Sequence, residues 1–497
     1  MFSDEILETV DFKSAWRKER SVRDSEAQTD ELTTNSVAVQ SLKRREKAVQ
    51  TASEQKELRM VEDNSPQLVN FLKSVESLMI KELEKNRRSR AFDDFSVSWE
   101  DESNAVSCIH TLCNEEFDEQ LQITGLSWNS TGAVIAASYG RFDHKDWCTH
   151  RSALCTWNLD RQNINDKKPN TTMDSSSCLM CIQFHPKNPA WVAAGNFNGE
   201  VLVWNLNRED DMLMATSGIG NDAHREPVSK VHWIPDISSK AKGYNLVSVS
   251  GDGKILVWKV DPGSPTLQLL DGFVVMTQSL PRSMKVKGVR GDKEVGIISI
   301  SYNCEDRELF IVGSESGAIF KCSMLTQGNP AGSHIVSSVP LKSPVTFTYS
   351  PHHGPVYSVE CSPFHRNAFM SAAMDQCIRL YSILQQTPVL TVEPGEGYIF
   401  SAKWSPMCPT VFAATTESGN LLLYDLKRNQ PVPVQKIQAS PNRMPVFSCQ
   451  FNPYRHSLLA TGDGSGYINV FRLSDELRKT SSKDIDILGN LVSVSAE

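Results

Sequence analysis

The sequence predicts an all-β protein: a seven-bladed β-propeller preceded by a disordered tail and one amphipathic helix. Three observations lead to this prediction. A register of aromatic or Cys residues returns seven times, most repeats contain a Gly turn, and the composition changes near residue 65. With 497 residues, of which 40% are hydrophobic and 22% charged, the chain has room for a large repeat domain with flanking segments.

Each repeat contains two apolar strands that end in anchor residues, an aromatic residue or Cys. Five pairs of anchors are twenty positions apart and two pairs have extra residues between them: Phe184/Trp204, Tyr302/Cys322, Cys361/Tyr381, Trp404/Tyr424 and Phe451/Phe471, then Trp128/Trp157 and Trp233/Trp258. Between the anchors lie a strand of small residues and a tight turn such as Asn198-Gly199, where Gly permits a positive φ. Seven copies of this meander predict a propeller.

A propeller has to close into a ring. The last repeat supplies only three strands, up to Leu473, whereas the segment Ala105–Leu112 before the first repeat has the pattern of a strand. We therefore expect Ala105–Leu112 to pair with the last blade. Two insertions lengthen the repeats, and the one at 272–296 is basic, which makes it either a partner contact or a solvated loop.

Composition excludes several classes of function. A net charge of −8 argues against binding to nucleic acid. The N-terminus lacks a signal-peptide pattern and no apolar run approaches the roughly 20 residues of a membrane span, so we expect a soluble intracellular protein without membrane insertion. The 12 cysteines suit a reducing compartment, and the lone Cys178/Cys181 pair lies in a strand pattern. We predict no metal site and no cofactor.

An enzyme is not expected either. The sequence has no nucleophile elbow, no HExxH and no GxxxxGK[ST] segment. We interpret two groups of residues as solvated parts of loops: His144, which is close to Asp143 and Asp146, and the pair His352-His353. No catalytic residue is therefore predicted.

Residues 1–64 are polar and poor in aromatic residues, which predicts disorder. Two segments of this tail contain a Gln-Thr pair, Gln28-Thr29 and Gln50-Thr51, and 37–41 is a weaker version. They resemble motifs for the eight-kilodalton dynein light chain, which would take such a peptide as an added β-strand. Two motifs on one tail would raise the effective concentration for a light-chain dimer.

Residues 65–90 predict an amphipathic helix, with Ser65 as N-cap and Pro66 at the first helical position. Its apolar residues recur at helical spacing and form one stripe: Leu68, Phe71, Leu72, Val75, Leu78, Met79 and Leu83. Two interpretations stay open. The helix either packs on the propeller or lies in the groove of a partner protein.

The repeats resemble the WD-repeat family over about residues 97–473. They depart from the family pattern because the usual Gly-His opening is absent and the turn Asp is present only as Asp252, Asp375 and Asp463. We therefore expect a weaker internal hydrogen-bond network, but the same fold. The expected domains are the tail at 1–64, the helix at 65–90, the propeller at 91–474 and a flexible C-terminal tail at 475–497.

The order of tail, helix and propeller resembles a dynein intermediate chain. The resemblance is to the intermediate chains of cytoplasmic dynein 2 in these stretches: Ile80–Asn86, Ala91–Asp93, Trp128–Gly132, Tyr139–His144, Leu280–Ser283 and Cys361–Asn367. It implies a non-catalytic subunit whose propeller binds the heavy-chain tail. It also implies light-chain binding by Gln28, Thr29, Gln50 and Thr51, roadblock-type light-chain binding by the helix, and pairing with a second dynein 2 intermediate chain.

The resemblance further implies retrograde intraflagellar transport and cilium assembly. The expected locations are the cytoplasm and cytoskeleton, the axoneme and basal body of the cilium, and the centrosome. The alternative is a WD-repeat adaptor of another complex, such as a ubiquitin-ligase substrate receptor or a signalling scaffold. The loop Arg141–Arg151 is where we would first expect a specific contact.

Overall fold

The computed structural model describes residues 66–88, 106–117, 121–144, 147–209, 211–236, 243–285, 293–326, 337–428 and 431–493. They belong to two units, one with helix α1 (Pro66–Arg88) and one with the propeller, and each unit is considered by itself. In these ranges, no helix has the length and apolar character needed to cross a membrane.

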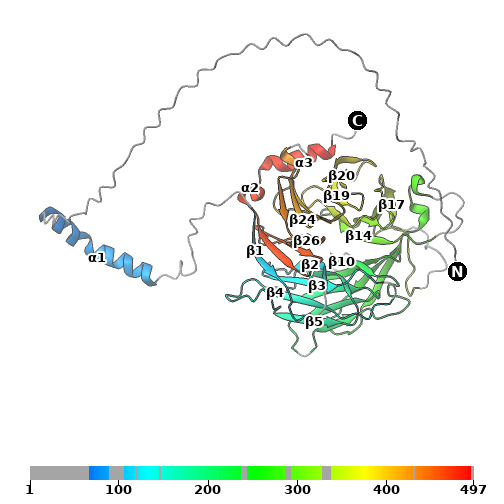
Figure 1. The fold of residues 1–497 in the computed structure, drawn as a ribbon, viewed down its shortest axis with the longest axis horizontal. Helices are drawn as coiled ribbons and strands as arrows, with labels where there is room; N and C mark the ends of the chain where they lie inside the picture. The colour runs from blue at the N-terminus through cyan, green and yellow to red at the C-terminus, as the bar shows by residue number, and fades with distance from the viewer. Residues whose placement is uncertain are drawn as a thin grey trace, which may run out of the picture. The chain divides into compact units, whose positions relative to one another are not determined.

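The propeller unit consists of seven antiparallel sheets of four strands, arranged in a ring (Figure 1). Residues of all seven innermost strands line its central channel. In each blade the innermost strand is given first. Blades 1 to 3 contain β2 (Gln122–Trp128), β3 (Val134–Gly140), β4 (Ser152–Asn158) and β5 (Thr171–Ser175); β6 (Leu179–Phe184), β7 (Trp191–Asn196), β8 (Val201–Asn205) and β9 (Leu213–Thr216); and β10 (Val228–Pro235), β11 (Tyr244–Ser250), β12 (Lys254–Lys259) and β13 (Gln268–Val274).

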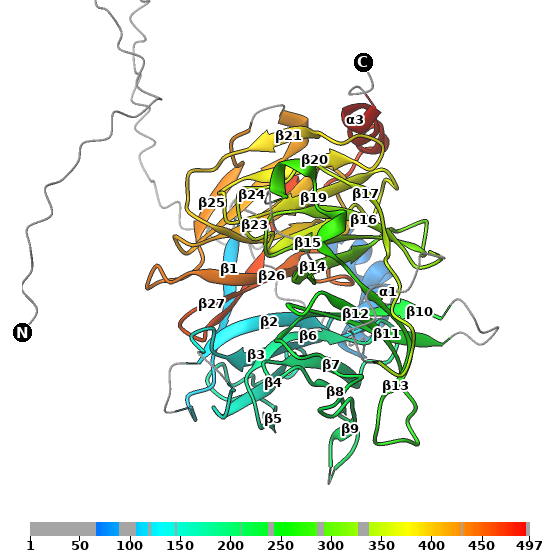
Figure 2. The same ribbon diagram turned by 90° about the vertical axis from the view of Figure 1, so that its right-hand side faces the viewer.

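Blades 4 to 7 continue around the ring (Figure 2). They contain β14 (Ile297–Tyr302), β15 (Leu309–Ser314), β16 (Ile319–Ser323) and β17 (Val345–Thr348); β18 (Ser358–Cys361), β19 (Ala368–Ala372), β20 (Ile378–Ser382) and β21 (Pro388–Val392); β22 (Ile399–Trp404), β23 (Val411–Thr416), β24 (Asn420–Asp425) and β25 (Gln435–Gln438); and β26 (Val446–Phe451), β27 (Leu458–Asp463), β28 (Ile468–Arg472) and β1 (Ser107–Leu112). Short 3₁₀ turns follow β13, as η1 (Thr277–Ser279) and η2 (Arg282–Met284), and β24, as η3 (Leu426–Arg428).

The two anchors of each repeat lie on either side of one residue of the middle strand. In blade 2, for example, Val192 is paired with Phe184 on one side and with Trp204 on the other. In blade 1, Ile135 is flanked in the same way by Trp128 and Trp157. The sequence register therefore corresponds to a row of side chains across three strands, which is a unit of sheet stabilisation.

The predicted Gly turns are confirmed. Gly199 has a φ of 89°, and a Cβ there would lie 2.3 Å from the backbone oxygen of His224, so only Gly fits this turn. The outermost strands of blades 1 to 6 were not predicted, because five of these six strands have only four or five residues and they follow the second anchor of the repeat.

Strand β1 closes the ring, as expected. It pairs with β28, and Leu112 opposes Ile468 at the end of this ladder. The inner strands of neighbouring blades are in contact all the way round, including β26 with β2. Trp indoles add bonds between blades: the Nε1–H of Trp128 donates to the carbonyl of Gln450 in blade 7 at 3.1 Å.

The expectation of a weak internal hydrogen-bond network is wrong for blades 3 and 5. His352 is buried, its Nδ1 lies 2.9 Å from Asp375, and its Nε2 lies 2.7 Å from the hydroxyl of Ser371. His224 makes the equivalent contacts with Asp252, at 3.1 Å, and Ser248, at 2.7 Å.

These two histidines make the contacts expected of the His in the Gly-His opening of a WD repeat, although neither is preceded by Gly. The interpretation of His352 as a solvated loop residue is therefore also wrong, whereas His353 beside it is exposed.

The expectation of a flexible C-terminal tail at 475–497 is wrong for residues 475–493. They form two helices, α2 (Asp475–Arg478) and α3 (Ser482–Ser493). Leu488 and Val492 of α3 are buried in the apolar cluster of blades 5 and 6. Buried Asp484 pairs with Lys427 at 2.7 Å, which attaches this helix to the end of blade 6.

Candidate interaction surfaces

Helix α1 carries an apolar stripe that is open to solvent. The predicted residues all lie on this helix: Leu68, Phe71, Leu72, Val75, Leu78, Met79 and Leu83. Six of them are exposed, with Phe71 at 60%, Leu78 at 65% and Leu83 at 62% of their full accessible surface, and Val75 is intermediate. An exposed apolar stripe of this length is typical of a helix that binds in a groove.

The predicted light-chain motifs cannot be placed in the fold. Gln28, Thr29, Gln50 and Thr51 lie outside the described residues, as does the N-cap Ser65. Their role stays a prediction from the sequence.

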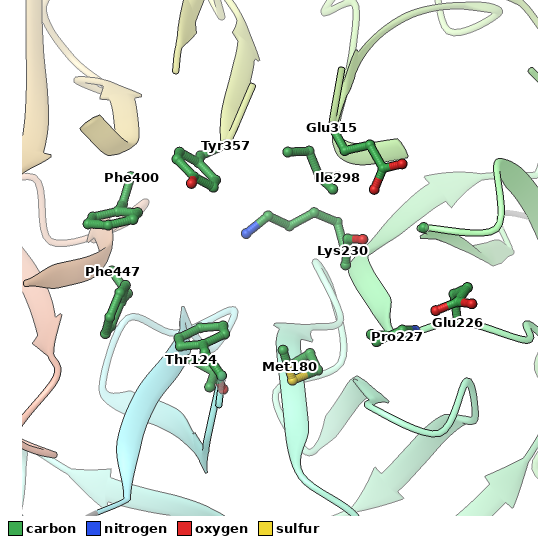
Figure 3. A pocket seen from close by; sticks show the side chains of 13 residues that line it. Thr124, Met180, Glu226, Pro227, Lys230, Ile298, Glu315, Tyr357, Phe400 and Phe447 are labelled. Atoms are coloured by element: carbon green, nitrogen blue, oxygen red, sulfur yellow. The ribbon is translucent and has the colours of Figure 1, made fainter. Parts of the chain in front are cut away.

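One end of the propeller channel widens into a cavity of about 720 Å³. The cavity lies at the end of the ring where the inner strands begin. Most of these strands contribute their second or third residue to its wall: Thr124, Met180, Lys230, Ile298, Phe400 and Phe447. Figure 3 shows the aromatic rings on one side and the carboxylate of Glu315 on the other.

The aromatic side of this channel mouth is a continuous ladder of rings. Ring centroids are 5.2 Å apart for Tyr357 and Phe400, 4.9 Å for Phe400 and Phe447, and 4.8 Å for Phe447 and Phe142. Lys230 extends its ammonium group towards these rings (Figure 3), and desolvation in the channel lowers its pKa. The aromatic ladder offers apolar faces to a partner segment, whereas the carboxylate of Glu315 lies on the opposite side of the cavity.

The basic insertion after β13 is only partly described. Lys285 bonds the carbonyl of Gln278 at 2.7 Å, so this Lys folds back on its own loop. The Lys287 and Arg290 positions lie outside the described residues.

The loop between β3 and β4 contains a cluster of possible metal ligands. The ligand atoms of His144, Cys148 and His150 all lie within 4.8 Å of one another. The ring of His144 is stacked on Phe197 with 4.2 Å between centroids, and this residue is half-buried rather than fully solvated. Asp143 is bound to Arg141 at 2.8 Å, and Asp146 lies outside the described residues.

Known proteins with similar sequences agree with the propeller fold. The family model of the WD domain, G-beta repeat, matches residues 343–382, which include β18 to β20. Over 495 residues the chain is 39% identical to cytoplasmic dynein 2 intermediate chain 2 of Mus musculus, covering 98% of this chain and 92% of that protein. The protein of the same name from Homo sapiens is 42% identical over 425 residues, covering 85% of this chain and 79% of its own length.

A more distant relative is the 78 kDa intermediate chain of the flagellar outer arm dynein of Chlamydomonas reinhardtii. It is 25% identical over 370 residues, which are 73% of this chain and 50% of that protein. The two dynein 2 relatives are thus much more similar, and the match to the mouse protein extends through the propeller and helix α1. The chain therefore belongs to the family of WD-repeat intermediate chains of cytoplasmic dynein 2.

Proposed function

We propose that this chain is a non-catalytic intermediate chain of the cytoplasmic dynein 2 complex. The observation that carries the proposal is the 39% identity that spans 98% of this chain and 92% of a relative with that name. The ring is closed by the pairing of β1 with β28. A closed ring suits a scaffold protein, because it presents binding surfaces at fixed positions.

In this proposal the propeller binds the tail of the dynein 2 heavy chain, which contains the motor. The complex acts in retrograde intraflagellar transport and in cilium assembly. The chain then resides in the cytoplasm and on the cytoskeleton, including the axoneme, the basal body and the centrosome.

Helix α1 is the proposed binding element for a roadblock-type light chain. The exposed stripe supports this role: Leu72 and Met79 are 53% and 55% exposed, and burying them in a groove is favourable. The tail motifs Gln28-Thr29 and Gln50-Thr51 are proposed to bind the eight-kilodalton light chain. Through these light chains, this chain pairs with a second dynein 2 intermediate chain.

Affinity purification of the tagged full-length chain from ciliated cells, followed by mass spectrometry, tests the proposal. We expect a dynein 2 heavy chain, both light chains and a second intermediate chain in the eluate. If the heavy chain is absent and cullin adaptors are recovered instead, the result would favour a ubiquitin-ligase substrate receptor.

A deletion of residues 1–88 separates the two binding regions in the same experiment. It retains β1 and hence a closed ring, so it should lose both light chains and keep the heavy chain. Loss of the heavy chain from this folded variant would contradict the assignment of heavy-chain binding to the propeller.

A further inference from the structure

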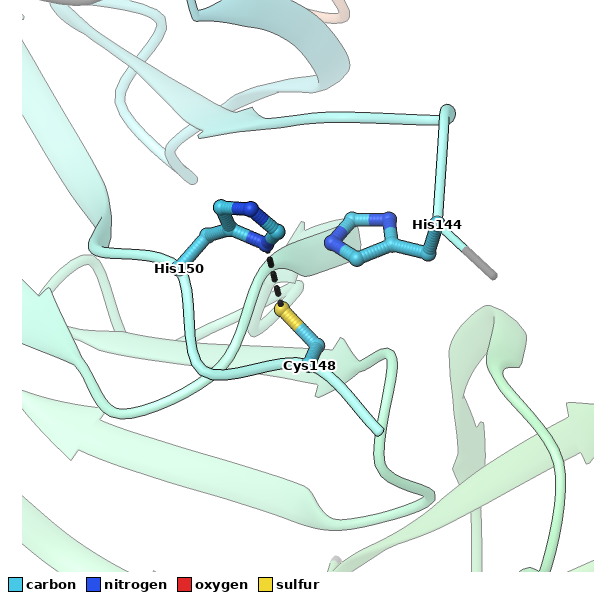
Figure 4. A group of neighbouring side chains, drawn as sticks. All are labelled: His144, Cys148 and His150. Atoms are coloured by element: carbon cyan, nitrogen blue, oxygen red, sulfur yellow. Dashed lines mark hydrogen bonds between the residues drawn. The ribbon is translucent and has the colours of Figure 1, made fainter. Parts of the chain in front are cut away.

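The loop between β3 and β4 brings three metal-binding side chains together at the boundary of blades 1 and 2 (Figure 4). The Sγ atom of Cys148 and Nδ1 of His150 are 3.8 Å apart, and the rings of His150 and His144 have centroids 5.1 Å apart. In a tetrahedral zinc site, bonds of about 2.0–2.3 Å place neighbouring ligand atoms roughly 3.5 Å from one another. The side chains therefore need only a small contraction to share one ion.

The surroundings of His144 also favour a ligand role. Both its ring nitrogens are buried without a well-formed hydrogen bond in the part of the chain that the structure describes, and the backbone of Arg141 makes the polar contact to the ring. His224 and His352, by contrast, use both nitrogens in hydrogen bonds. One nitrogen of His144 is therefore available to an ion.

The surroundings hold Cys148 in place. The side chain of Asn198, in the turn between β7 and β8, accepts the N–H of Cys148 and donates to its carbonyl, each at 3.0 Å. The backbone N–H of Cys178 donates to Sγ of Cys148 at 3.3 Å. Such N–H···S bonds stabilise a thiolate and orient it, as outer-shell groups of metal sites do.

We propose that His144, Cys148 and His150 bind a Zn²⁺ ion, with the fourth position open to water. One thiolate and two imidazoles are a ligand set that suits zinc. His150 is exposed, which leaves a path for the ion. The ion would tie the β3–β4 loop of blade 1 to the turn of blade 2 that carries Phe197 and Asn198. This departs from the sequence-based expectation of no metal.

The zinc content of the protein tests the proposal directly. Full-length protein produced with added zinc, kept reduced and then desalted, should contain about one zinc per chain by elemental mass spectrometry. The substitutions Cys148→Ser and His150→Ala should lower the zinc content to background. Because His150 is exposed, its removal should leave the fold intact, which a circular dichroism melt can verify.

Matched controls are available in other loops. Cys304 and His353 are exposed, so Cys304→Ser and His353→Ala should retain full zinc content. Replacement of zinc by Co²⁺ should give a thiolate-to-metal absorption band that is lost in Cys148→Ser and kept in Cys304→Ser. Wild-type protein without zinc and without this band would overturn the proposal, as would a Cys148→Ser variant that retains its zinc. Either result leaves the dynein 2 assignment untouched.

Discussion

Cys108 on β1 is paired with Phe471 on β28, so a strand from before the first repeat completes the sheet of the last blade. At the far end of the same strand Leu112 is fully buried. The ring is thus closed by backbone hydrogen bonds and by apolar packing between distant parts of the chain. Removing this strand would expose the edge of β28.

Deletion of residues 1–114 should therefore lower the melting temperature of the propeller, whereas deletion of 1–64 should not. The point variant Leu112→Ala should cost about 2–5 kcal/mol, the usual range for truncating a buried Leu. Thermal melts of the two deletion variants measure the melting temperatures, and urea denaturation of Leu112→Ala measures its loss of stability. An unchanged melting temperature after deletion of 1–114 would show that β1 does not stabilise the ring.

His352→Ala should destabilise blade 5 by about 2–3 kcal/mol. The substitution leaves the hydroxyl of Ser371 without its partner and removes one partner of buried Asp375. The neighbouring His353→Ala is the control and should change stability by no more than about 0.5 kcal/mol, because His353 is exposed. Equal urea midpoints for the two variants would contradict a structural role for His352.

Acidification should destabilise the protein through His185. Burial, aided by Lys187, lowers the pKa of His185 to about 4. Its Nδ1 accepts hydrogen bonds from the N–H groups of Lys187, at 3.0 Å, and Asn188, at 2.8 Å. Nδ1 must therefore stay unprotonated, which keeps the imidazole neutral. Because the unfolded His, with a pKa near 6.5, binds the proton more tightly, stability is complete above about pH 6.5 and falls towards pH 4.

We expect this His to account for a loss of about 2 kcal/mol between pH 7 and pH 5. The chain itself provides a matched variant, because Asn452 accepts the equivalent N–H groups of Tyr454, at 3.0 Å, and Arg455, at 2.8 Å. Urea denaturation of His185→Asn at both pH values should show a smaller loss than wild type. An identical loss would assign the pH dependence to other groups.

Phe71→Asp combined with Leu78→Asp should abolish co-purification of a roadblock-type light chain. A charge in the middle of the stripe cannot be buried in an apolar groove without a large cost. Lys73 and Lys81 are exposed residues of the same helix, so Lys73→Asp with Lys81→Asp is a control for charge. Retention of this light chain by the stripe variant, with heavy chain also present, would refute this assignment.

Replacement of both Gln-Thr pairs, Gln28-Thr29 and Gln50-Thr51, by Ala-Ala should abolish co-purification of the eight-kilodalton light chain. Heavy-chain recovery should not change, since the propeller is untouched. Replacement of one pair should weaken binding far more than twofold, because the second motif acts through effective concentration. If the double variant still retained all of the light chain, the two motifs would not be its binding sites.

The seven blades and the stripe of α1 could be predicted because their signals are local. Trp128 and Trp157 mark strand ends on either side of Ile135, and the stripe follows the helical period. The C-terminal helix α3 was not predicted, because its 12 residues form a helix whose buried face depends on blades 5 and 6. A helix this short gains most of its stability from such packing.

The hydrogen-bonded histidines and the His–Cys cluster were also missed. His224 and Asp252 are 28 positions apart, whereas His352 and Asp375 are 23 apart, so no fixed spacing marks the pair. In the β3–β4 loop, the spacing of His144, Cys148 and His150 was visible, but the buried environment comes from Phe197 and Asn198 of the next blade.

The sequence by itself determined the repeat, its turns, the number of blades and the amphipathic helix. Each of these depends on residues close together in the chain, where strand alternation, Gly conformation and helical period act directly. Only the tertiary structure decided which polar side chains are buried and paired, such as His352 with Asp375, and which loop side chains converge, such as His144 with Cys148. The physical reason is that burial and hydrogen bonding at these positions are created by neighbouring blades, whose approach no local pattern encodes.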